Sequence, residues 1–130
     1  MALNPSAPAV KEGGQRHMKI LMQSRKDMNK EDLYFLMVRE SEKMQTLAGQ
    51  TVKVDDWVIT EDIDKETEEP KQIIFIKSND VTYGSISKTF IESFKTIVEC
   101  FGPDGFTHIK VIEGKSNKGR NFIQCEYAKA

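Results

Sequence analysis

Residues that build disulfides and metal sites are scarce in this chain. Its 130 residues include two cysteines, Cys100 and Cys125, and two histidines, His17 and His108. The cysteines lie far apart, and neither has a second ligand at the short spacing that zinc sites use. Because no secretory signal precedes them, both thiols are predicted to be reduced and half-buried. We therefore expect no disulfide, no structural zinc and no other cofactor.

Long apolar runs are absent as well. No run approaches the roughly 20 residues of a membrane-spanning helix, and the first 17 residues lack the apolar stretch of a secretory signal. Apolar residues make up 38% of the chain and charged residues 30%, which is ordinary for a globular protein. A chain of 130 residues can bury one hydrophobic core but not two. The sequence thus predicts a cytoplasmic protein with one core and no membrane partner.

Motifs for catalysis and nucleotide binding are missing too. The segment Gly114-Lys-Ser resembles the end of a P-loop, but that motif needs glycine where this chain has Ile109. No Gly-rich dinucleotide motif, nucleophile elbow or metal-binding His pair occurs. Asp55 and Asp56 leave a metal-dependent nuclease as an alternative, but they lack the spacing of a known metal loop. The chain is predicted not to be an enzyme.

The chain as a whole lacks the basic excess that nucleic-acid-binding proteins usually show. Its net charge is −1, but residues 61–69 alone hold six acidic residues and one lysine, a net charge of −5. The rest of the chain therefore has a net charge of +4. This distribution predicts a mildly basic body with one acidic loop. The loop is interpreted as solvated and inert, with a gate that repels nucleic acid and a docking segment for a basic partner as alternatives.

The amino-terminal part divides into two predicted segments. Residues 1–17 are rich in Ala, Pro, Gly and Ser, and they are predicted to be disordered or a cloning remnant ahead of Met18. Residues 18–49 are predicted to form a helical extension, with a helix over residues 29–47. Apolar residues cover more than one face of this helix. It is therefore expected either to dock on its own domain or to offer a surface for self-association or for a partner.

From Gln50 onward the apolar pattern changes to the alternation of β-strands. Five strands are predicted, over residues 52–59, 71–78, 81–87, 106–114 and 120–127. Asp55-Asp56 interrupts the alternation in the first of them, where a bulge is expected. The third and fourth strands are separated by an amphipathic helix that Ser87 caps and Gly102 ends. Its apolar face is predicted to be core and consists of Phe90, Phe94, Ile97 and Phe101.

This order of elements predicts a mainly β fold, a five-stranded OB-type barrel with one helix between strands three and four and an extra amino-terminal helix. The predicted OB-type domain spans residues 50–128. An α+β sheet with two hairpins is the competing fold.

Two segments carry a resemblance to a known family. The first, Tyr83-Gly-Ser-Ile-Ser-Lys-Thr, ends a predicted hairpin, and the second, Ile109-Lys-Val-Ile-Glu-Gly-Lys-Ser-Asn-Lys-Gly-Arg, joins a strand to a lysine-rich turn. In their order and spacing they resemble the single-stranded DNA-binding proteins of phi-29-type, protein-primed bacteriophages. The resemblance covers roughly Lys71 to Tyr127, and the predicted helix over residues 29–47 has no counterpart in it.

The resemblance implies an OB-like fold, no cofactor, no catalysis and single-stranded DNA as the partner. It implies a protein that coats and protects displaced strands during phage DNA replication, in the cytoplasm of the bacterial host. Replication proteins of the phage would be further partners. The amino-terminal helix departs from the family pattern, so it is the candidate surface for self-association.

Cations that contact phosphates are predicted on one hairpin. Lys115, Lys118 and Arg120 fall within six residues between the fourth and fifth strands, a loop that OB proteins use to clasp oligonucleotides. Lys77 and Lys88 flank the third strand and are predicted to add to this basic face.

Aromatic rings that stack on bases are predicted on the strands. The candidates are Trp57, Phe75 and Tyr83, because the second and third strands form the binding face of an OB barrel. Each ring has the hydrophobic core as its alternative place. Non-sequence-specific binding of single-stranded DNA is the predicted function, and an OB-type adaptor that binds a host or replication protein is the alternative.

Overall fold

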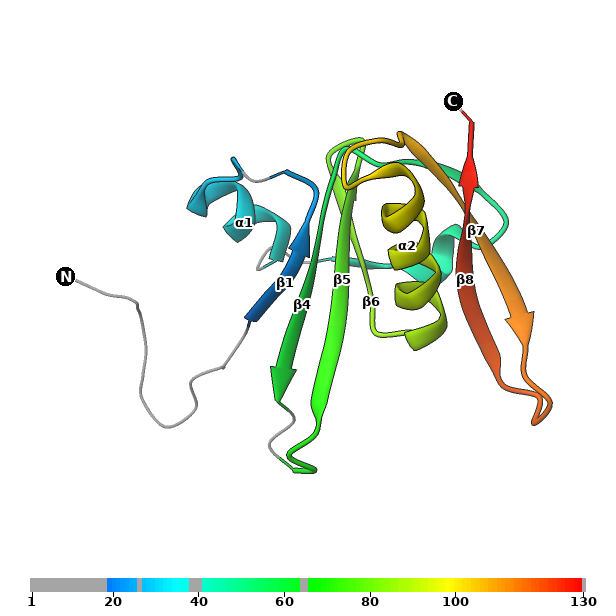
Figure 1. The fold of residues 1–130 in the computed structure, drawn as a ribbon. Coiled ribbons are helices and arrows are strands. Elements are labelled where there is room, and N and C mark those ends of the chain that lie inside the picture. Colours follow the sequence, from blue (N-terminus) through cyan, green and yellow to red (C-terminus); the bar gives the residue numbers. More distant parts are fainter. Residues whose placement is uncertain (1–18, 26, 38–40, 64–65, 130) are drawn as a thin grey trace.

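The computed structural model describes residues 19–25, 27–37, 41–63 and 66–129 as two β-sheets with a helix between them (Figure 1). Sheet A has the strand order β1-β4-β5-β6-β2, and sheet B has the order β3-β7-β8. The strands are β1 (Lys19–Gln23), β2 (Glu42–Lys43), β3 (Thr51–Lys53), β4 (Asp56–Ile63), β5 (Pro70–Ser78), β6 (Val81–Ser85), β7 (His108–Lys115) and β8 (Asn121–Ala128). The helices are α1 (Lys30–Met37), the 3-10 helix η1 (Met44–Leu47) and α2 (Lys88–Phe101). The predicted mainly β fold is confirmed.

The predicted first strand is two strands, β3 and β4, that belong to different sheets. The chain changes sheet between two consecutive residues. The Val54 amide donates to the Thr107 carbonyl next to sheet B at 2.8 Å, and the Asp55 amide donates to the Lys77 carbonyl of sheet A at 2.8 Å. The interruption expected at Asp55-Asp56 is therefore a bend that joins the two sheets, and it begins one residue earlier.

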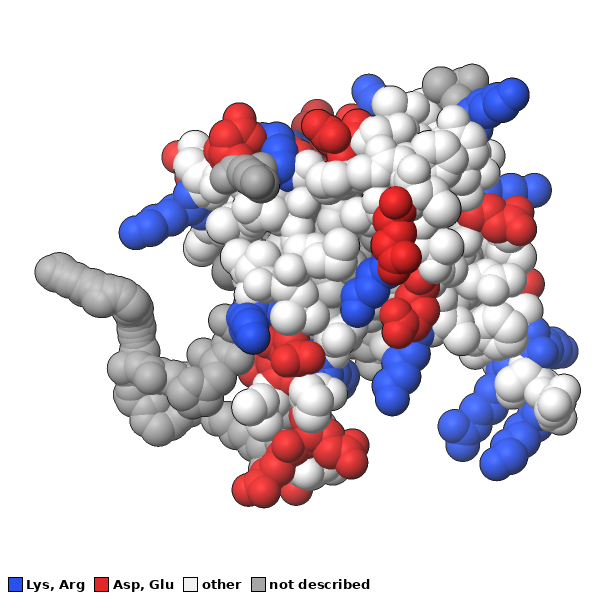
Figure 2. Space-filling model, viewed as in Figure 1, with Lys and Arg blue, Asp and Glu red and all other residues white. Residues whose placement is uncertain are grey.

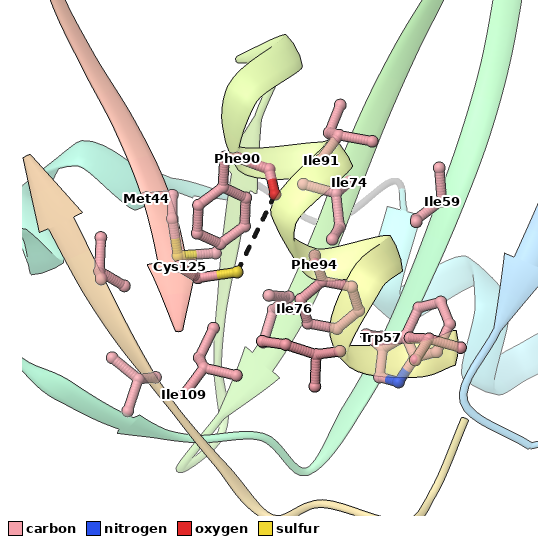
Figure 3. Packing of buried hydrophobic residues seen from close by; sticks show 14 of the residues in the cluster. Met44, Trp57, Ile59, Ile74, Ile76, Phe90, Ile91, Phe94, Ile109 and Cys125 are labelled. Carbon is pink, nitrogen blue, oxygen red and sulfur yellow. Dashed lines mark hydrogen bonds between the residues drawn. The ribbon is translucent and has the colours of Figure 1, made fainter. Parts of the chain in front are cut away.

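Helix α2 fills the space between the sheets. Ser87 caps it by accepting a hydrogen bond from the Phe90 amide, and Gly102 ends it with φ at 86°. Phe94 lies at the centre of the core, where its ring is edge-on to Trp57 at a centroid distance of 4.9 Å (Figure 3). It is also edge-on to Phe106, at 5.5 Å. Fully burying a side chain of this size stabilises a fold by about 1.5–3 kcal/mol. Both sheets therefore depend on the apolar face of α2.

One residue predicted as core lies outside it. Phe101, the last residue of α2, is 42% exposed, and its ring stacks on Tyr127 with centroids 4.2 Å apart. The helical spacing was read correctly, but the helix projects past the region that the two sheets enclose. The prediction for Phe101 is wrong, whereas Phe90, Phe94 and Ile97 are buried as predicted.

The described strands form two open sheets and no closed barrel. An OB barrel would need β6 to pair with β8, but β6 pairs in parallel with β2. The edge of β8 is covered by α2 instead: Thr89 Oγ1 donates to the Ile123 carbonyl at 2.7 Å, and Ser93 Oγ accepts from the Cys125 amide at 2.9 Å. The five-stranded barrel is thus not confirmed, although β3, β7 and β8 on one side and β4, β5 and β6 on the other contain all five predicted strands.

The predicted helix over residues 29–47 is correct only in its first part. Asn29 caps α1 through a 2.8 Å hydrogen bond from the Asp32 amide, as expected, and the described helix runs from Lys30 to Met37. Further on, Glu42 and Lys43 pair with β6, and Met44 is fully buried in the main core. Helical spacing of apolar residues is overridden here because pairing with β6 places Met44 in the core.

Strand β1 is a further element that the sequence did not predict, and it pairs with β4 in sheet A. Residues 1–17, predicted to be disordered or a cloning remnant, lie outside the described residues. The division of the chain near residue 50 into an extension and a domain stays a prediction.

Helix α1 covers the face of sheet A that points away from α2 (Figure 1). It buries a second, smaller cluster made of Met28, Leu36, Val58 and Phe75. Arg25, just ahead of α1, donates from Nε to Asp56 Oδ1 at 3.1 Å and from Nη2 to Asp32 Oδ2 at 3.2 Å. The carboxylate of Asp56, and after it that of Asp27, raises the pKa of Arg25 above its usual value. The ion pairs hold α1 against the sheet.

Candidate nucleic-acid interface

The basic hairpin consists of β7, β8 and the turn between them. Its turn is closed by backbone hydrogen bonds from Ser116 to Arg120 at 2.8 Å and from Gly119 to Ser116 at 2.9 Å. The Ser116 hydroxyl also accepts from the Arg120 amide at 3.2 Å. Gly119 has φ at 78°, a conformation that glycine adopts without strain. Backbone hydrogen bonds, the Ser116 hydroxyl and one glycine therefore fix the shape of this turn, and its basic side chains take no part in it.

The three predicted phosphate-binding cations of this hairpin are exposed and free. Lys115, Lys118 and Arg120 are all exposed, and their basic groups gather at one tip of the molecule (Figure 2). Within the described part of the chain, none of these side chains forms an ion pair. Cations that are not neutralised by a neighbouring carboxylate can exchange their counterions for phosphates.

The other two predicted cations lie in different places. Lys88 is the exposed first residue of α2 and lies at the same end of the molecule as the basic turn (Figure 1). It lines a cavity of about 580 Å³ between α2 and the β4–β5 hairpin. Lys77 lies near the far end of β5, half-buried, with its amine 3.9 Å from Asp80. The structure brings Lys88 close to the basic hairpin and leaves Lys77 apart.

The predicted stacking residues are less accessible than the cations. Trp57 is 1% exposed, and its indole Nε1 donates to the Pro103 carbonyl at 3.0 Å. Phe75 is 9% exposed under α1, and Tyr83 is half-buried against the main core. The enclosed rings of Trp57 and Phe75 present no open face to a base in this conformation. Their role in stacking stays a prediction that the geometry does not favour.

Sequence reasoning missed one aromatic side chain of the basic hairpin. Phe122 is half-exposed on β8, and its register partner on β7 is Gly114. A methyl group built on Gly114 would stand 2.7 to 3.2 Å from three atoms at the outer end of the Phe122 ring. The ring therefore lies against the glycine backbone. The signal that could have found it was glycine opposite an aromatic residue in a predicted hairpin.

The β4–β5 hairpin is acidic and lies across from the basic hairpin, with α2 between them (Figures 1 and 2). Its described part includes exposed Glu66, Glu68 and Glu69, whereas residues 64 and 65 lie outside the described residues. Glu68 adopts φ at 59°, an uncommon conformation for a residue other than glycine. The two hairpins thus place opposite charges at one end of the molecule.

The acidic pair considered for a nuclease is engaged in structural contacts. Asp56 accepts from Arg25 and from Ser24 Oγ, the latter at 3.0 Å. Asp55 accepts from the Asn79 amide at 2.8 Å and pairs with Lys53 at 3.4 Å. In the part of the chain that the structure describes, no group of three His, Cys, Asp or Glu residues is arranged to hold a metal ion. Within the same residues, no helix has the length and apolar character to cross a membrane.

Free cations on a hairpin are a feature that proteins use to contact the phosphates of single-stranded nucleic acids. The sequence matches the family model described as phage single-stranded DNA-binding protein, of the phi29 type, over residues 33–127. The chain belongs to this family, as its two sequence segments suggested. The match also extends upstream of the resemblance and includes the segment from α1 to β5. Comparisons with curated proteins and with solved structures found no match.

Proposed function

We propose that this protein binds single-stranded DNA without sequence preference and coats displaced strands during phage DNA replication. The observation that carries the proposal is the cluster of free cations on the basic hairpin, in a chain that belongs to a family of phage single-stranded DNA-binding proteins. Cations on a rigid turn bind phosphates, which every DNA sequence presents alike. Such contacts supply affinity and no base preference.

In this proposal Lys115, Lys118 and Arg120 hold the phosphates, and Lys88 adds a fourth cation at the same end of the molecule. Each phosphate that is neutralised releases counterions from the DNA, so affinity falls steeply as salt rises. The chain has a net charge of −1, so repulsion from the rest of the protein offsets part of this attraction. Binding is therefore expected to be modest and strongly dependent on salt.

The direct test is the anisotropy of a dye-labelled oligo(dT) as the protein is added at low salt. Binding that weakens linearly with the logarithm of salt concentration supports the proposal. An extrinsic dye is the right reporter because Trp57 is enclosed by the core and its emission need not respond to DNA. No change in anisotropy at any protein concentration at low salt would overturn the proposal.

A second candidate function is that of an adaptor for a host or replication protein, and it rests on α1. Tyr34 and Phe35 are 56% and 49% exposed there, and their rings meet edge-on at 5.5 Å. Exposed aromatic pairs are common at protein interfaces. Replacing both with serine would abolish capture of such a partner, or self-association, and leave oligo(dT) binding unchanged. The opposite result would assign α1 to the DNA site.

A further inference from the structure

The two sheets differ in how their outer faces, the faces that point away from α2, are covered. Helix α1 lies on the outer face of sheet A and buries Phe75 there. On sheet B, the buried residues Val111, Ile123 and Cys125 point inward toward α2. No helix of the described chain lies on its opposite face, which is open in Figure 1.

The register of β7 and β8 defines the residues of this open face. Facing pairs alternate between the buried face and the open face along the hairpin. The pairs on the open face are Gly114 with Phe122, Ile112 with Gln124, Lys110 with Glu126 and His108 with Ala128. Strand β3 continues the face through Thr51, which pairs with Lys110, and Lys53, which pairs with His108.

Phe122 is the aromatic ring of this face, and its position depends on Gly114. Because glycine has no side chain, the ring end lies against the backbone of β7 instead of over a neighbouring side chain. One side of the ring is supported by the protein, and the residue remains half-exposed. Supported aromatic rings of this kind are the surfaces on which proteins stack single-stranded bases.

Basic residues continue from Phe122 in both directions along the face. Lys118 and Arg120 lie at the adjacent turn, and Lys110 is exposed farther along β7. Glu126 is the acidic residue within the paired strands of this face. In Figure 2 blue groups alternate with red ones along the right-hand side of the molecule, and blue groups alone gather at the basic tip. At about 3.4 Å per residue, the eight residues of β7 span roughly 27 Å, which is a track for several nucleotides.

We propose that single-stranded DNA lies along the open face of sheet B, with one base stacked on Phe122 and the phosphates held by Lys110 and by the cations of the basic turn. The inference rests on the proposed function and adds a path and a stacking residue to it. Lys110 and the cations of the basic turn attract a polyanion, and the supported ring favours one whose bases are unpaired and free to stack. The α1-covered face of sheet A, where Phe75 lies, takes no part in this path.

The test compares Phe122→Leu with Tyr127→Leu in oligo(dT) binding. Both residues are partly exposed aromatics of β8, but Tyr127 lies on the opposite face, stacked on Phe101. Loss of one stacked base weakens binding by about 5-fold to 150-fold. Phe122→Leu is expected to show this loss with an unchanged salt dependence, because no phosphate contact is removed. Phe122→Tyr is expected to bind as the unchanged protein does, and so is Tyr127→Leu.

A cross-linking experiment on the unaltered protein covers the case in which a variant fails to fold. Oligo(dT) carrying 5-iodouracil is bound, irradiated and mapped to the peptide it modifies. A cross-link to the peptide containing Phe122 supports the path, and cross-links confined to Phe75 or Tyr83 overturn it. If the unaltered protein binds oligo(dT) but Phe122→Leu binds equally well, the path is wrong and the proposed function stands. If the unaltered protein does not bind, the proposed function itself fails.

Discussion

The two hairpins that flank α2 share a construction and differ in charge. Each pairs over eight positions in an antiparallel register, β4 with β5 and β7 with β8. One ends in an acidic segment, and the other ends in a turn with three cations in six residues. The geometry of the basic turn comes from backbone hydrogen bonds, the Ser116 hydroxyl and one glycine. Its charged side chains therefore have no structural role. The comparison teaches that this fold can place either charge at a hairpin tip without altering the strands.

Removing the support that both hairpins share should produce the largest effect. Phe94→Ala leaves a cavity between the sheets, and we expect the free energy of unfolding to fall by about 3–5 kcal/mol. The measurement is denaturant unfolding followed by circular dichroism. Phe101→Ala on the same helix is the control, because that residue is 42% exposed. An equal loss in both variants would show that the core does not support the hairpins as described.

Removing the three cations of the basic hairpin should remove most of its contribution to DNA affinity. At up to about 1 kcal/mol for each exposed ion pair, the triple change of Lys115, Lys118 and Arg120 to alanine should weaken oligo(dT) binding on the order of 100-fold. The slope of log affinity against log salt should fall by about 2, since a single strand gives about 0.7 per phosphate.

The matched control for this triple variant changes Lys19, Lys30 and Lys43 to alanine. These three lysines are also exposed, but they lie on β1, α1 and β2. Both variants lose the same net charge, so only a specific site separates them. Equal losses of affinity would mean that overall charge, not the basic hairpin, determines binding.

A buried thiol distinguishes the basic hairpin from the acidic one at high pH. Burial raises the pKa of Cys125 to about 11, while a hydrogen bond with Ser93 opposes the shift. The folded state thus holds this proton more tightly than the unfolded chain does. The resulting stability is present below the unfolded pKa of 9.0 and is lost as pH rises toward 11, an effect of about 2 kcal/mol.

The measurement is the melting temperature of the unaltered protein and of Cys125→Ala between pH 8 and 11. The difference between the two should shrink as pH rises, because the alanine variant has no thiol to ionise. Parallel curves would show that Cys125 does not titrate in this range.

The tips of the two hairpins also differ in which residue adopts positive φ: glycine in the basic turn and glutamate in the acidic hairpin. One substitution in each tests the strain at these positions. Gly119→Ala should lower the free energy of unfolding by about 1 kcal/mol, since its φ is 78° and no atom lies near enough to clash. Glu68→Asn should leave stability unchanged or raise it by a few tenths of a kcal/mol, because asparagine tolerates φ near 59°. Thermal unfolding measures both, and a loss of stability in Glu68→Asn would contradict the assigned conformation.

The smallest expected effect concerns the acidic hairpin. Changing Glu68 and Glu69 to glutamine removes two exposed charges across from the cations. If those charges repel DNA, oligo(dT) affinity should rise by about 2-fold to 5-fold at low salt and not at high salt, where screening acts within roughly 10 Å or less. Unchanged affinity at low salt would favour the interpretation of this segment as solvated and inert.

Local signals in the sequence predicted the elements that depend on local interactions. Ser87 and Gly102 delimit α2 as expected, and Gly119 marks the basic turn. Features set by long-range pairing were missed. The bend at Val54 was interpreted as a bulge. Met44 was assigned to a long helix, but its burial comes from the pairing of β2 with β6, which the local pattern does not show.

In the candidate site, too, features set by local sequence could be predicted and features set by distant packing could not. Charged residues at a turn are exposed in almost any hairpin, so the three cations could be found from sequence. Whether an aromatic residue of a strand faces solvent depends on what packs against it. Trp57 is enclosed by α2, and Phe75 is covered by α1. Phe122 is half-exposed because no helix of the described residues lies on the outer face of sheet B. The sequence does not state which face a distant helix will cover.

The hydrogen bonds between α2 and the edge of β8 bear on how copies of this protein can crowd together. An unsatisfied strand edge recruits strands of other molecules and leads to aggregation. Here hydroxyl groups of Thr89 and Ser93 already occupy a carbonyl and an amide of that edge. This contact therefore leaves fewer free backbone groups along β8 for a strand of another molecule to pair with. The same contact that holds α2 in place thus protects part of an exposed strand edge.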